Sequence, residues 1–284
     1  MEGSTTTTCF DVVIVGAGMS GINAAYRVQN ETSAGTNYVI LESRDALGGT
    51  WDLFRYPGLR SDSDMFTFGL PWDPWNQPRS MASGQDIKNY MSEAAQRSGI
   101  ASKIRYGHTV TAASWKSKTM NWELEVSVAG KDEPIILKAK FALLGTGYYN
   151  YKTPLQAHIP GIDNFGGEVI HPQFWPKAYD YPGKNIVIIG SGATAVTLVP
   201  SVADKAERVT MLQRSPTYIL ALLDTHFIIS FLFAALPKSG ASSILWFVYL
   251  LGSVLSNLFC ELSPELAKLF IKAVTLRQLP SEIK

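Results

Sequence analysis

The sequence has few cysteines, few charges and no excess of either sign. Cys9 and Cys260 are the only cysteines in 284 residues, so neither a disulfide framework nor a zinc-binding cysteine cluster can form. The 25 Lys and Arg balance 24 Asp and Glu, which leaves no basic field to hold a phosphate backbone. We therefore expect no nucleic-acid partner and a reducing, cytoplasmic compartment.

A secretory signal is also missing, because residues 1–11 lack a basic start and an apolar middle. With 46% hydrophobic and 17% charged residues, the composition is that of a globular protein and not of a disordered chain. The length predicts two domains of ordinary size or one large domain.

A glycine-rich motif stands near the N-terminus between a strand-like and a helix-like run. Residues 10–15 (FDVVIV) predict the strand, and the helix continues to about Gln29. Between them stand Gly16, Gly18 and Gly21. The first glycine permits a tight turn, the second lets a pyrophosphate approach the backbone, and the third allows close packing of helix on strand. This order predicts a dinucleotide-binding unit.

An acidic residue follows the second strand of this unit. Residues 38–41 (YVIL) predict that strand, and Glu42 lies 21 residues after Gly21. A carboxylate at this place can accept hydrogen bonds from both hydroxyls of an adenosine ribose. The acid favours a nucleotide with an unphosphorylated ribose, such as FAD or NAD.

A second copy of the pattern begins at residue 185. Residues 185–189 (NIVII) and 208–212 (RVTML) predict two strands with a helix between them. Gly190 and Gly192 open the turn, and Ala195 takes the third small position. The chain therefore predicts a second Rossmann-like fold.

The second unit carries a cation where the first carries Glu42. Arg214 and Ser215 follow the strand, and an arginine fork can bind a ribose 2′-phosphate, which selects NADP over NAD. An arginine at a strand end is often simply solvated, but within this unit we favour the phosphate-binding role. Because one unit ends its second strand with an acid and the other with a cation, we predict that they bind two different dinucleotides.

A small β meander is predicted between the two units, over residues 109–141, with the strands HTVTAASW, NWELEVSV and PIILKAKF. Residues 141–147 (FALLGTG) then predict a strand that returns to the first unit. The predicted fold class is α/β, with two Rossmann-like dinucleotide-binding domains for FAD and NADPH, a small β meander and a helical C-terminal segment.

Two motifs resemble those of Baeyer-Villiger monooxygenases. Residues 165–176 (FGGEVIHPQFWP) fit the FxGxxxHxxxWP fingerprint of that family, with Phe165, Gly167, His171 and Trp175 at its defined places. Residues 49–62 (GTWDLFRYPGLRSD) resemble its GxWxxxxYPGxxxD element. The sister family of heteroatom-oxidising flavin monooxygenases has tyrosine or phenylalanine in place of the fingerprint tryptophan, so the sequence sides with the Baeyer-Villiger branch.

The resemblance implies a monooxygenase that uses FAD, NADPH and O2. NADPH reduces FAD, O2 adds to the reduced flavin at C4a, and the peroxyflavin attacks the carbonyl of a small, apolar ketone to give an ester or lactone. The protein excludes water and holds the cofactors in register. The alternatives are N- or S-hydroxylation by the same flavin chemistry, or a remnant that binds nucleotide or a partner protein without catalysis. The sequence has no CxxC pair, which argues against a disulfide reductase.

The resemblance also assigns two groups of cofactor-binding residues. The FAD group is Gly16, Gly18, Ser20, Gly21, Glu42, Gly49, Thr50, Trp51, Asp62, Phe68 and the backbone of Val110. The NADP group is Gly190, Ser191, Gly192, Ala193, Thr194, Arg214 and Ser215, with Arg60 and Ser61 nearby on the flavin side.

The resemblance implies that the catalytic residues are an acid and an arginine. In relatives an acid at the place of Asp62 pairs with an arginine that stabilises negative charge on the flavin peroxide. Arg277 is the candidate for that arginine, and an ordinary loop carboxylate is the alternative interpretation of Asp62. The resemblance makes His171 a linker residue that couples domain movement, not a general base, and makes Trp175 a packing residue.

Residues 239–260 form an uncharged run of 22 residues. About 20 apolar residues suffice to cross a bilayer, so membrane association through this run is one interpretation. Four small or polar residues at 252, 253, 256 and 257 weaken it, and we favour a buried or lid helix. Residues 262–277 predict an amphipathic helix with Ser263 as its N-cap and Pro264 in its first turn.

The predicted domains are an FAD-binding domain with the meander (1–150), a linker with the core of an NADPH-binding domain (151–218) and a helical, apolar segment (219–284). Family members are much longer and return to the FAD domain after the NADPH domain. We therefore expect that the family's C-terminal part is missing here. We also expect that the chain alone binds FAD weakly or not at all and turns over poorly, because an incomplete sheet exposes apolar faces and strand edges.

Overall fold

The computed structural model describes residues 8–155, 157–215, 219 and 227–279. The chain divides into two compact units, each with one glycine motif. The first unit comprises the residues up to Arg55 together with Gly84–Trp175, and the second comprises Tyr56–Ser83 with the residues from Pro176 onward. The predicted limit at residue 218 lies outside the described residues.

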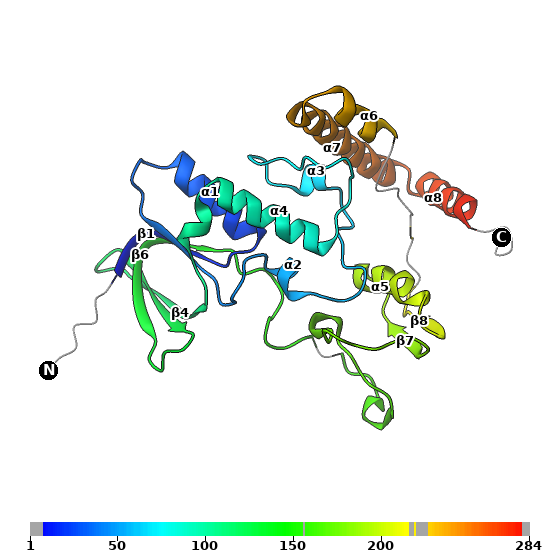
Figure 1. Ribbon diagram of the computed structural model, residues 1–284, viewed down its shortest axis with the longest axis horizontal. Helices are drawn as coiled ribbons and strands as arrows, with labels where there is room; N and C mark the ends of the chain where they lie inside the picture. The colour runs from blue at the N-terminus through cyan, green and yellow to red at the C-terminus, as the bar shows by residue number, and fades with distance from the viewer. Residues whose placement is uncertain (1–7, 156, 216–218, 220–226, 280–284) are drawn as a thin grey trace. The chain divides into compact units, whose positions relative to one another are not determined.

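A six-stranded sheet in the order β3-β2-β1-β6-β5-β4 forms the first unit (Figure 1). Its strands are β1 (Thr8–Val15), β2 (Tyr38–Leu41), β3 (Ile104–Arg105), β4 (His108–Lys116), β5 (Asn121–Val128) and β6 (Ile135–Leu144). The strand β1 runs parallel to β2 and β6, whereas β4, β5 and β6 are antiparallel. The predicted meander is therefore continuous with the dinucleotide-binding sheet. Its third strand and the returning strand are one strand, β6, because this strand pairs with both β5 and β1.

The helix at Met19–Glu31 packs on one face of the parallel part of this sheet, and side chains of β5 pack against the other face. The helices are α1 (Met19–Glu31), α2 (Thr50–Leu53) and α4 (Gly84–Arg97), with short 3-10 turns η1 (Ile100–Lys103), η2 (Ile162–Asn164) and η3 (Pro172–Phe174). Ile14 of β1 faces α1, while Val13 joins a buried cluster with Leu124 and Val126 of β5. Alternate side chains of β1 are thus buried on opposite faces, as expected for a central parallel strand.

The second unit is built around a smaller parallel pair, β7 (Asn185–Ile189) and β8 (Arg208–Leu212), joined by α5 (Ala193–Ala203). Its other helices are α3 (Met65–Phe68), α6 (Phe227–Ala235), α7 (Lys238–Leu262) and α8 (Pro264–Gln278). Both strands begin and end where the sequence predicts. The two Rossmann-type units confirm the predicted α/β class.

The start of α7 packs inside the second unit. The hydroxyl of Ser242 donates a hydrogen bond to the backbone oxygen of Trp75 (2.7 Å), and the rings of Phe66 and Tyr249 lie 5.5 Å apart. Among the described residues α7 is the one helix long and apolar enough to cross a membrane, with 6% of its apolar window buried. A buried helix is therefore the wrong interpretation for most of its length, because only its N-terminal half contacts α3, and the lid interpretation stays a prediction.

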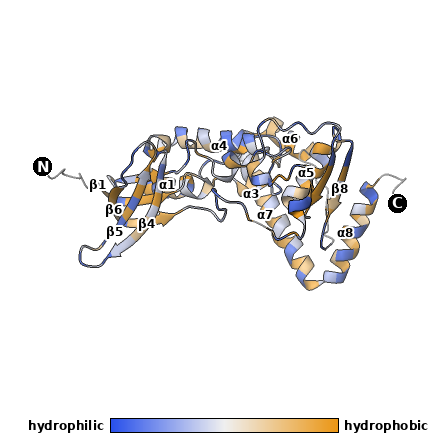
Figure 2. Cartoon of the chain, turned by 90° about the horizontal axis from the view of Figure 1, so that it is seen from below, coloured by the Kyte–Doolittle hydropathy of each residue, from blue (hydrophilic) through white to orange (hydrophobic). Residues whose placement is uncertain are grey.

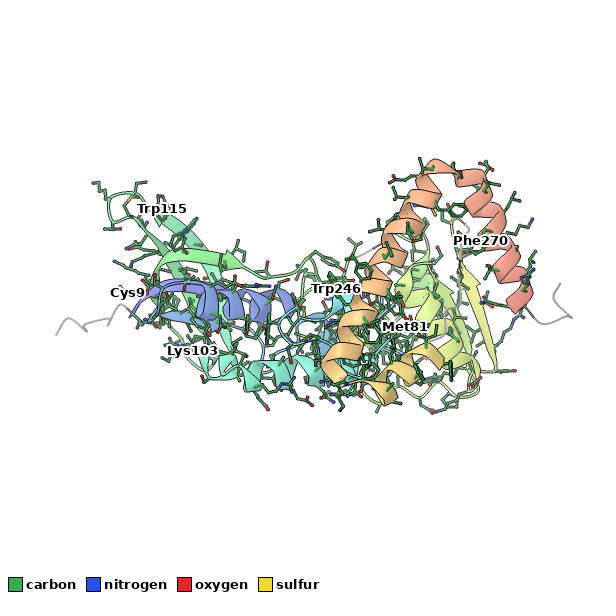
Figure 3. The ribbon with its side chains drawn as sticks, turned by 90° about the horizontal axis from the view of Figure 1, so that it is seen from above. Cys9, Met81, Lys103, Trp115, Trp246 and Phe270 are labelled. Atoms are coloured by element: carbon green, nitrogen blue, oxygen red, sulfur yellow. The ribbon has the colours of Figure 1, made fainter. Side chains whose placement is uncertain are left out.

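The exposed part of the apolar helix α7 is followed by α8, in which hydrophobic and hydrophilic residues are mixed (Figure 2). Trp246 of α7 and Phe270 of α8 are 46% and 60% exposed (Figure 3). Ser263 and Pro264 begin α8 as predicted, although the Ser263 side chain makes no capping hydrogen bond. Apolar side chains are also exposed on β6 and β7, Phe141 and Val187 among them. The expected exposure of apolar strand faces is therefore present on β6 and β7.

Candidate nucleotide-binding sites

The first glycine loop leaves no room for a side chain at Gly16 or Gly21. Gly16 has a φ of +101°, and a Cβ there would lie 2.5 Å from the backbone oxygen of Gly145. A Cβ on Gly21 would lie 1.8 Å from the backbone oxygen of Gly16. The loop is held to the sheet where the Gly16 N–H donates to Leu41 (2.7 Å) and the Gly145 N–H donates to Val15 (2.8 Å). The predicted roles of the first and third glycines thus have a geometric basis.

The N-terminus of α1 is open to an anion. Gly18 occupies its N-cap and supplies no side chain, so the N–H groups of the first turn have no side-chain cap. Ser20 lies exposed in that turn. Gly49 lies beside the cap, since a Cβ on Gly18 would come 3.7 Å from its Cα. This end of α1 fits a pyrophosphate by backbone hydrogen bonds and the helix dipole.

Glu42 lies at the carboxyl end of β2 and is 3% exposed. Its Oε2 accepts a hydrogen bond from the Ala17 N–H (2.7 Å), and its Oε1 accepts one from the Arg44 N–H (3.0 Å). Its carbonyl oxygen accepts the His108 N–H (2.9 Å), which brings Val110 of β4 to the same end of the sheet. The structure therefore joins Glu42 to the glycine loop and to the start of β4, which carries Val110, and the cofactor roles of these residues stay predictions.

Thr50 and Trp51 begin α2 directly after Gly49. The Tyr151 hydroxyl hydrogen-bonds to Thr50, and burial raises the pKa of this phenol although that hydrogen bond opposes the rise. The sequence reasoning missed Tyr151, which carries no motif and reaches Thr50 only because β6 returns its chain to the first unit.

The second glycine loop borders a cavity of about 590 Å³. Gly190 has a φ of +132°, and its N–H donates to the Leu212 carbonyl (2.8 Å). Gly192 caps α5, and Ala193 and Thr194 form its first turn. The cavity is lined by Ile189, Gly190, Ser191, Leu212, Gln213, Arg214 and Ser215. Four predicted NADP residues thus share one cavity, and its volume is suitable for a small-molecule site.

A loop from the first half of the sequence packs on α5 in this unit. The Tyr56 hydroxyl hydrogen-bonds to Thr194; burial raises the Tyr56 pKa, that hydrogen bond opposes the rise and the nearby Asp62 adds to it. Gly58 has a φ of +77°, and a Cβ there would come 1.9 Å from the Ser201 Oγ. The YPG element therefore fixes this loop against the helix of the second glycine loop.

Replacing Gly58 with alanine should destabilise the protein by about 2–3 kcal/mol, because a left-handed φ and a collision with Ser201 add up. Ser201→Ala should change little alone and should recover about 1 kcal/mol in the double variant. Gly183→Ala is the matched control, since Gly183 has a φ of +68° and open space around it. Urea unfolding measures all four variants. If Gly58→Ala and Gly183→Ala lower the free energy of unfolding equally, the collision with Ser201 adds nothing to the effect of the left-handed φ, and the prediction is wrong.

The other predicted flavin-side residues belong to the second unit. Ser61 is buried and its N–H donates to the Ala82 carbonyl (2.9 Å), whereas Arg60 and Asp62 are exposed. Phe68 ends α3. Arg277 lies exposed in the last turn of α8. All five residues belong to the second unit, and their roles stay predictions.

The fingerprint segment is ordered by its own side chains. A Cβ on Gly167 would come 2.6 Å from the Phe165 ring, which explains the FxG spacing. The His171 Nδ1 accepts a hydrogen bond from the Gln173 N–H (3.2 Å), and the buried Gln173 side chain donates to the Asn150 carbonyl (2.6 Å). Gln173, at a variable fingerprint position, was missed by sequence reasoning. The segment ends at Trp175, where the first unit ends.

Two Rossmann-type units, each with a glycine loop at a helix N-terminus, define an oxidoreductase fold with two dinucleotide sites. Residues 13–219 match the family model described as pyridine nucleotide-disulphide oxidoreductase, and the chain belongs to this family.

Relatives within the family are monooxygenases by name. The chain is 52% identical to the FAD-containing monooxygenase EthA of Mycolicibacterium smegmatis over 217 residues, which cover 76% of this chain and 44% of that protein. It is 42% identical to EthA of Mycobacterium tuberculosis (strain H37Rv) over 275 residues, covering 96% and 56%. The chain spans about half the length of the curated relatives it matches.

Solved structures with the same fold include Baeyer-Villiger monooxygenases. A cyclohexanone monooxygenase mutant from Rhodococcus sp. Phi1 bound to NADP+ matches with a TM-score of 0.68 and 27% identity, over 80% of this chain and 44% of that one. OTEMO in complex with FAD and NADP matches with a TM-score of 0.64 and 28% identity, over 76% and 41%. The resemblance stated from the motifs is confirmed at the level of family and fold.

Proposed function

We propose that this chain is the nucleotide-binding part of an FAD- and NADPH-dependent monooxygenase that transfers one oxygen atom from O2 to a small organic substrate. The observation that carries the proposal is the pair of glycine loops with opposite charges behind them, Glu42 in one unit and Arg214 in the other. The names of the relatives and the ligands of the matching structures support it.

In this proposal the first unit holds FAD. The open N-terminus of α1 binds the pyrophosphate, and Glu42 exchanges its contact with Ala17 for the ribose hydroxyls. Val110 lines the adenosine end, while Thr50 and Trp51 lie toward the flavin. The absence of a side-chain cap at Gly18 fits the group, because it leaves the first N–H groups of α1 available to a pyrophosphate.

The second unit holds NADPH. The cavity beside Ser191 accepts the cofactor, and Arg214 with Ser215 binds its 2′-phosphate. When bound, the two cofactors supply reducing equivalents and activate O2. The chain's own residues orient them and exclude water. An arginine, for which Arg277 is the candidate, stabilises the developing negative charge, and Asp62 pairs with that arginine. The fingerprint segment with His171 couples the movement of the units.

Oxidation of an apolar ketone to an ester or lactone is the reaction we propose, because both motifs side with the Baeyer-Villiger branch. N- or S-oxidation is the competing reaction, and a non-catalytic remnant is the competing class. A cytoplasmic location and membrane association through 239–260 stay predictions. The exposed apolar face of α7 is the feature that supports the second of them.

Spectroscopy and product analysis test the proposal. Incubation with FAD should give a saturable flavin band, which anaerobic NADPH should bleach. Under ¹⁸O2 a ketone should give an ester with one labelled oxygen, and a thioether offered in parallel should react more slowly. If sulfoxide is the sole product, heteroatom oxidation is the reaction of this protein and the proposed ketone oxidation is wrong. A folded chain that binds neither cofactor would contradict the proposal for this chain.

A further inference from the structure

A buried carboxylate, Asp52, lies beside the first glycine loop, at a position that the GxWxxxxYPGxxxD element leaves variable. The Asp52 side chain is 2% exposed, and its Oδ2 accepts hydrogen bonds from the Nε (3.2 Å) and Nη2 of Arg44. Its Oδ1 lies 2.6 Å from the Nζ of Lys88, and Arg55 lies at 3.9 Å. Burial alone would raise the Asp52 pKa, but the hydrogen bonds from Lys88 and Arg44 outweigh it and hold the pKa below its usual value.

The partners of Asp52 come from separate parts of the first unit. Arg44 follows β2, and its backbone N–H donates to the Oε1 of Glu42. Lys88 belongs to α4. Asp52 itself lies in α2, directly after Thr50 and Trp51, and its own N–H donates to the Gly49 carbonyl (3.1 Å). The Asp52 carboxylate therefore connects two segments. One is the turn after β2 that contains Glu42 and Arg44, and the other is α2, which begins at the residues predicted to lie near the flavin.

Stability is a weak explanation for this arrangement. The free energy lost when charged groups leave water is about as large as the free energy gained from their attraction. Buried ion pairs therefore stabilise a fold little more than apolar packing does. What such a cluster does provide is fixed geometry, because the planar guanidinium of Arg44 accepts only a narrow range of positions around one carboxylate. A Cβ on Gly48 would come 3.1 Å from the Asp52 Cβ, so the backbone also has little freedom there.

We infer that Asp52 is a positioning residue for the FAD site, which holds the Glu42–Arg44 turn and the Gly49–Trp51 turn in one fixed arrangement through Arg44 and Lys88. The inference rests on the proposed binding of FAD by this unit. Asp52 acts through its neighbours and does not itself contact the cofactor. The charges are needed because an amide in its place would leave both cations without their counter-ion.

The test compares Asp52→Asn with Asp11→Asn. Asp11 also pairs with a lysine, Lys140 at 2.7 Å, but it lies on β1 and its pair is exposed. Flavin fluorescence gives the dissociation constant for FAD, and NADPH binding to the second unit serves as the internal control. We expect FAD affinity to fall by about tenfold in Asp52→Asn, with no change in Asp11→Asn and none for NADPH in either variant.

Hydrogen exchange on the cofactor-free chain gives a second readout. Asp52→Asn should lose amide protection over residues 42–53 and keep it over β5 and β6. Unchanged FAD affinity and unchanged protection in folded Asp52→Asn would overturn the inference. If the unsubstituted chain shows no saturable FAD binding, the proposed function fails, and loss of protection over 42–53 alone would then support only the structural part of the inference.

Discussion

Gly21→Ala is expected to abolish FAD binding and to destabilise the first unit by at least about 3 kcal/mol. The added Cβ would come 1.8 Å from the Gly16 oxygen and 2.9 Å from its carbonyl carbon. Both are backbone atoms and cannot rotate away. Gly16 is itself tied to Leu41, so the collision can be relieved only by moving α1 off the sheet.

Displacement of α1 would remove more than packing. The helix carries the open N–H groups that we propose as the pyrophosphate site, and Ile22 and Ala25 behind them are completely buried. Gly166→Ala is the control, because a Cβ at Gly166 meets nothing within 4 Å and its φ needs no glycine. Urea unfolding and flavin titration measure both variants. A stable Gly21→Ala chain that still binds FAD would show that the loop and helix lie further apart than described.

The second unit shows why the third small position differs between the two loops. Ala195 stands there in place of glycine and is 6% exposed, so the α5 loop accommodates a Cβ that the α1 loop excludes. The choice of glycine or alanine at the third small position of each motif therefore reflects how closely the helix packs on the strand. It predicts that Ala195→Gly is tolerated far better than Gly21→Ala.

Local patterns predicted the dinucleotide units well because each is built from neighbours in sequence. The strands at 38–41, 185–189 and 208–212 begin and end as predicted, and β1 begins only two residues early. Glu42 falls at the carboxyl end of β2 for the same reason: the distance from glycine loop to acid is set by one helix and one strand.

The features that sequence reasoning missed depend on contacts between distant segments. Nothing in the spacing of Asp52 and Lys88 reveals that one carboxylate joins α2 and α4. The packing of Gly58 on Ser201 likewise places a loop of the first half in the second unit. The hydropathy of 239–260 could not separate a buried helix from a membrane-associated one, since an apolar helix is expected in both cases.

Arg214→Ala is expected to weaken NADPH binding by about tenfold to a hundredfold, because charge-assisted hydrogen bonds contribute about 1.5–3 kcal/mol. The side chain lies exposed at the rim of the cavity, directly after β8, so its removal disturbs no buried contact. NADH lacks the 2′-phosphate, and its affinity should change little. The selectivity ratio between the two cofactors is therefore the quantity that reports on Arg214.

Arg208→Ala is the matched control for this experiment. It removes the same charge from the same strand, but at the opposite end of β8, away from the cavity. Isothermal titration with each cofactor should leave its NADPH-to-NADH ratio unchanged. If Arg214→Ala lowers both affinities equally, the arginine binds a group common to the two cofactors, such as the pyrophosphate. If it lowers neither, Arg214 is a solvated strand-end residue, and the choice of NADPH has to come from elsewhere in the protein.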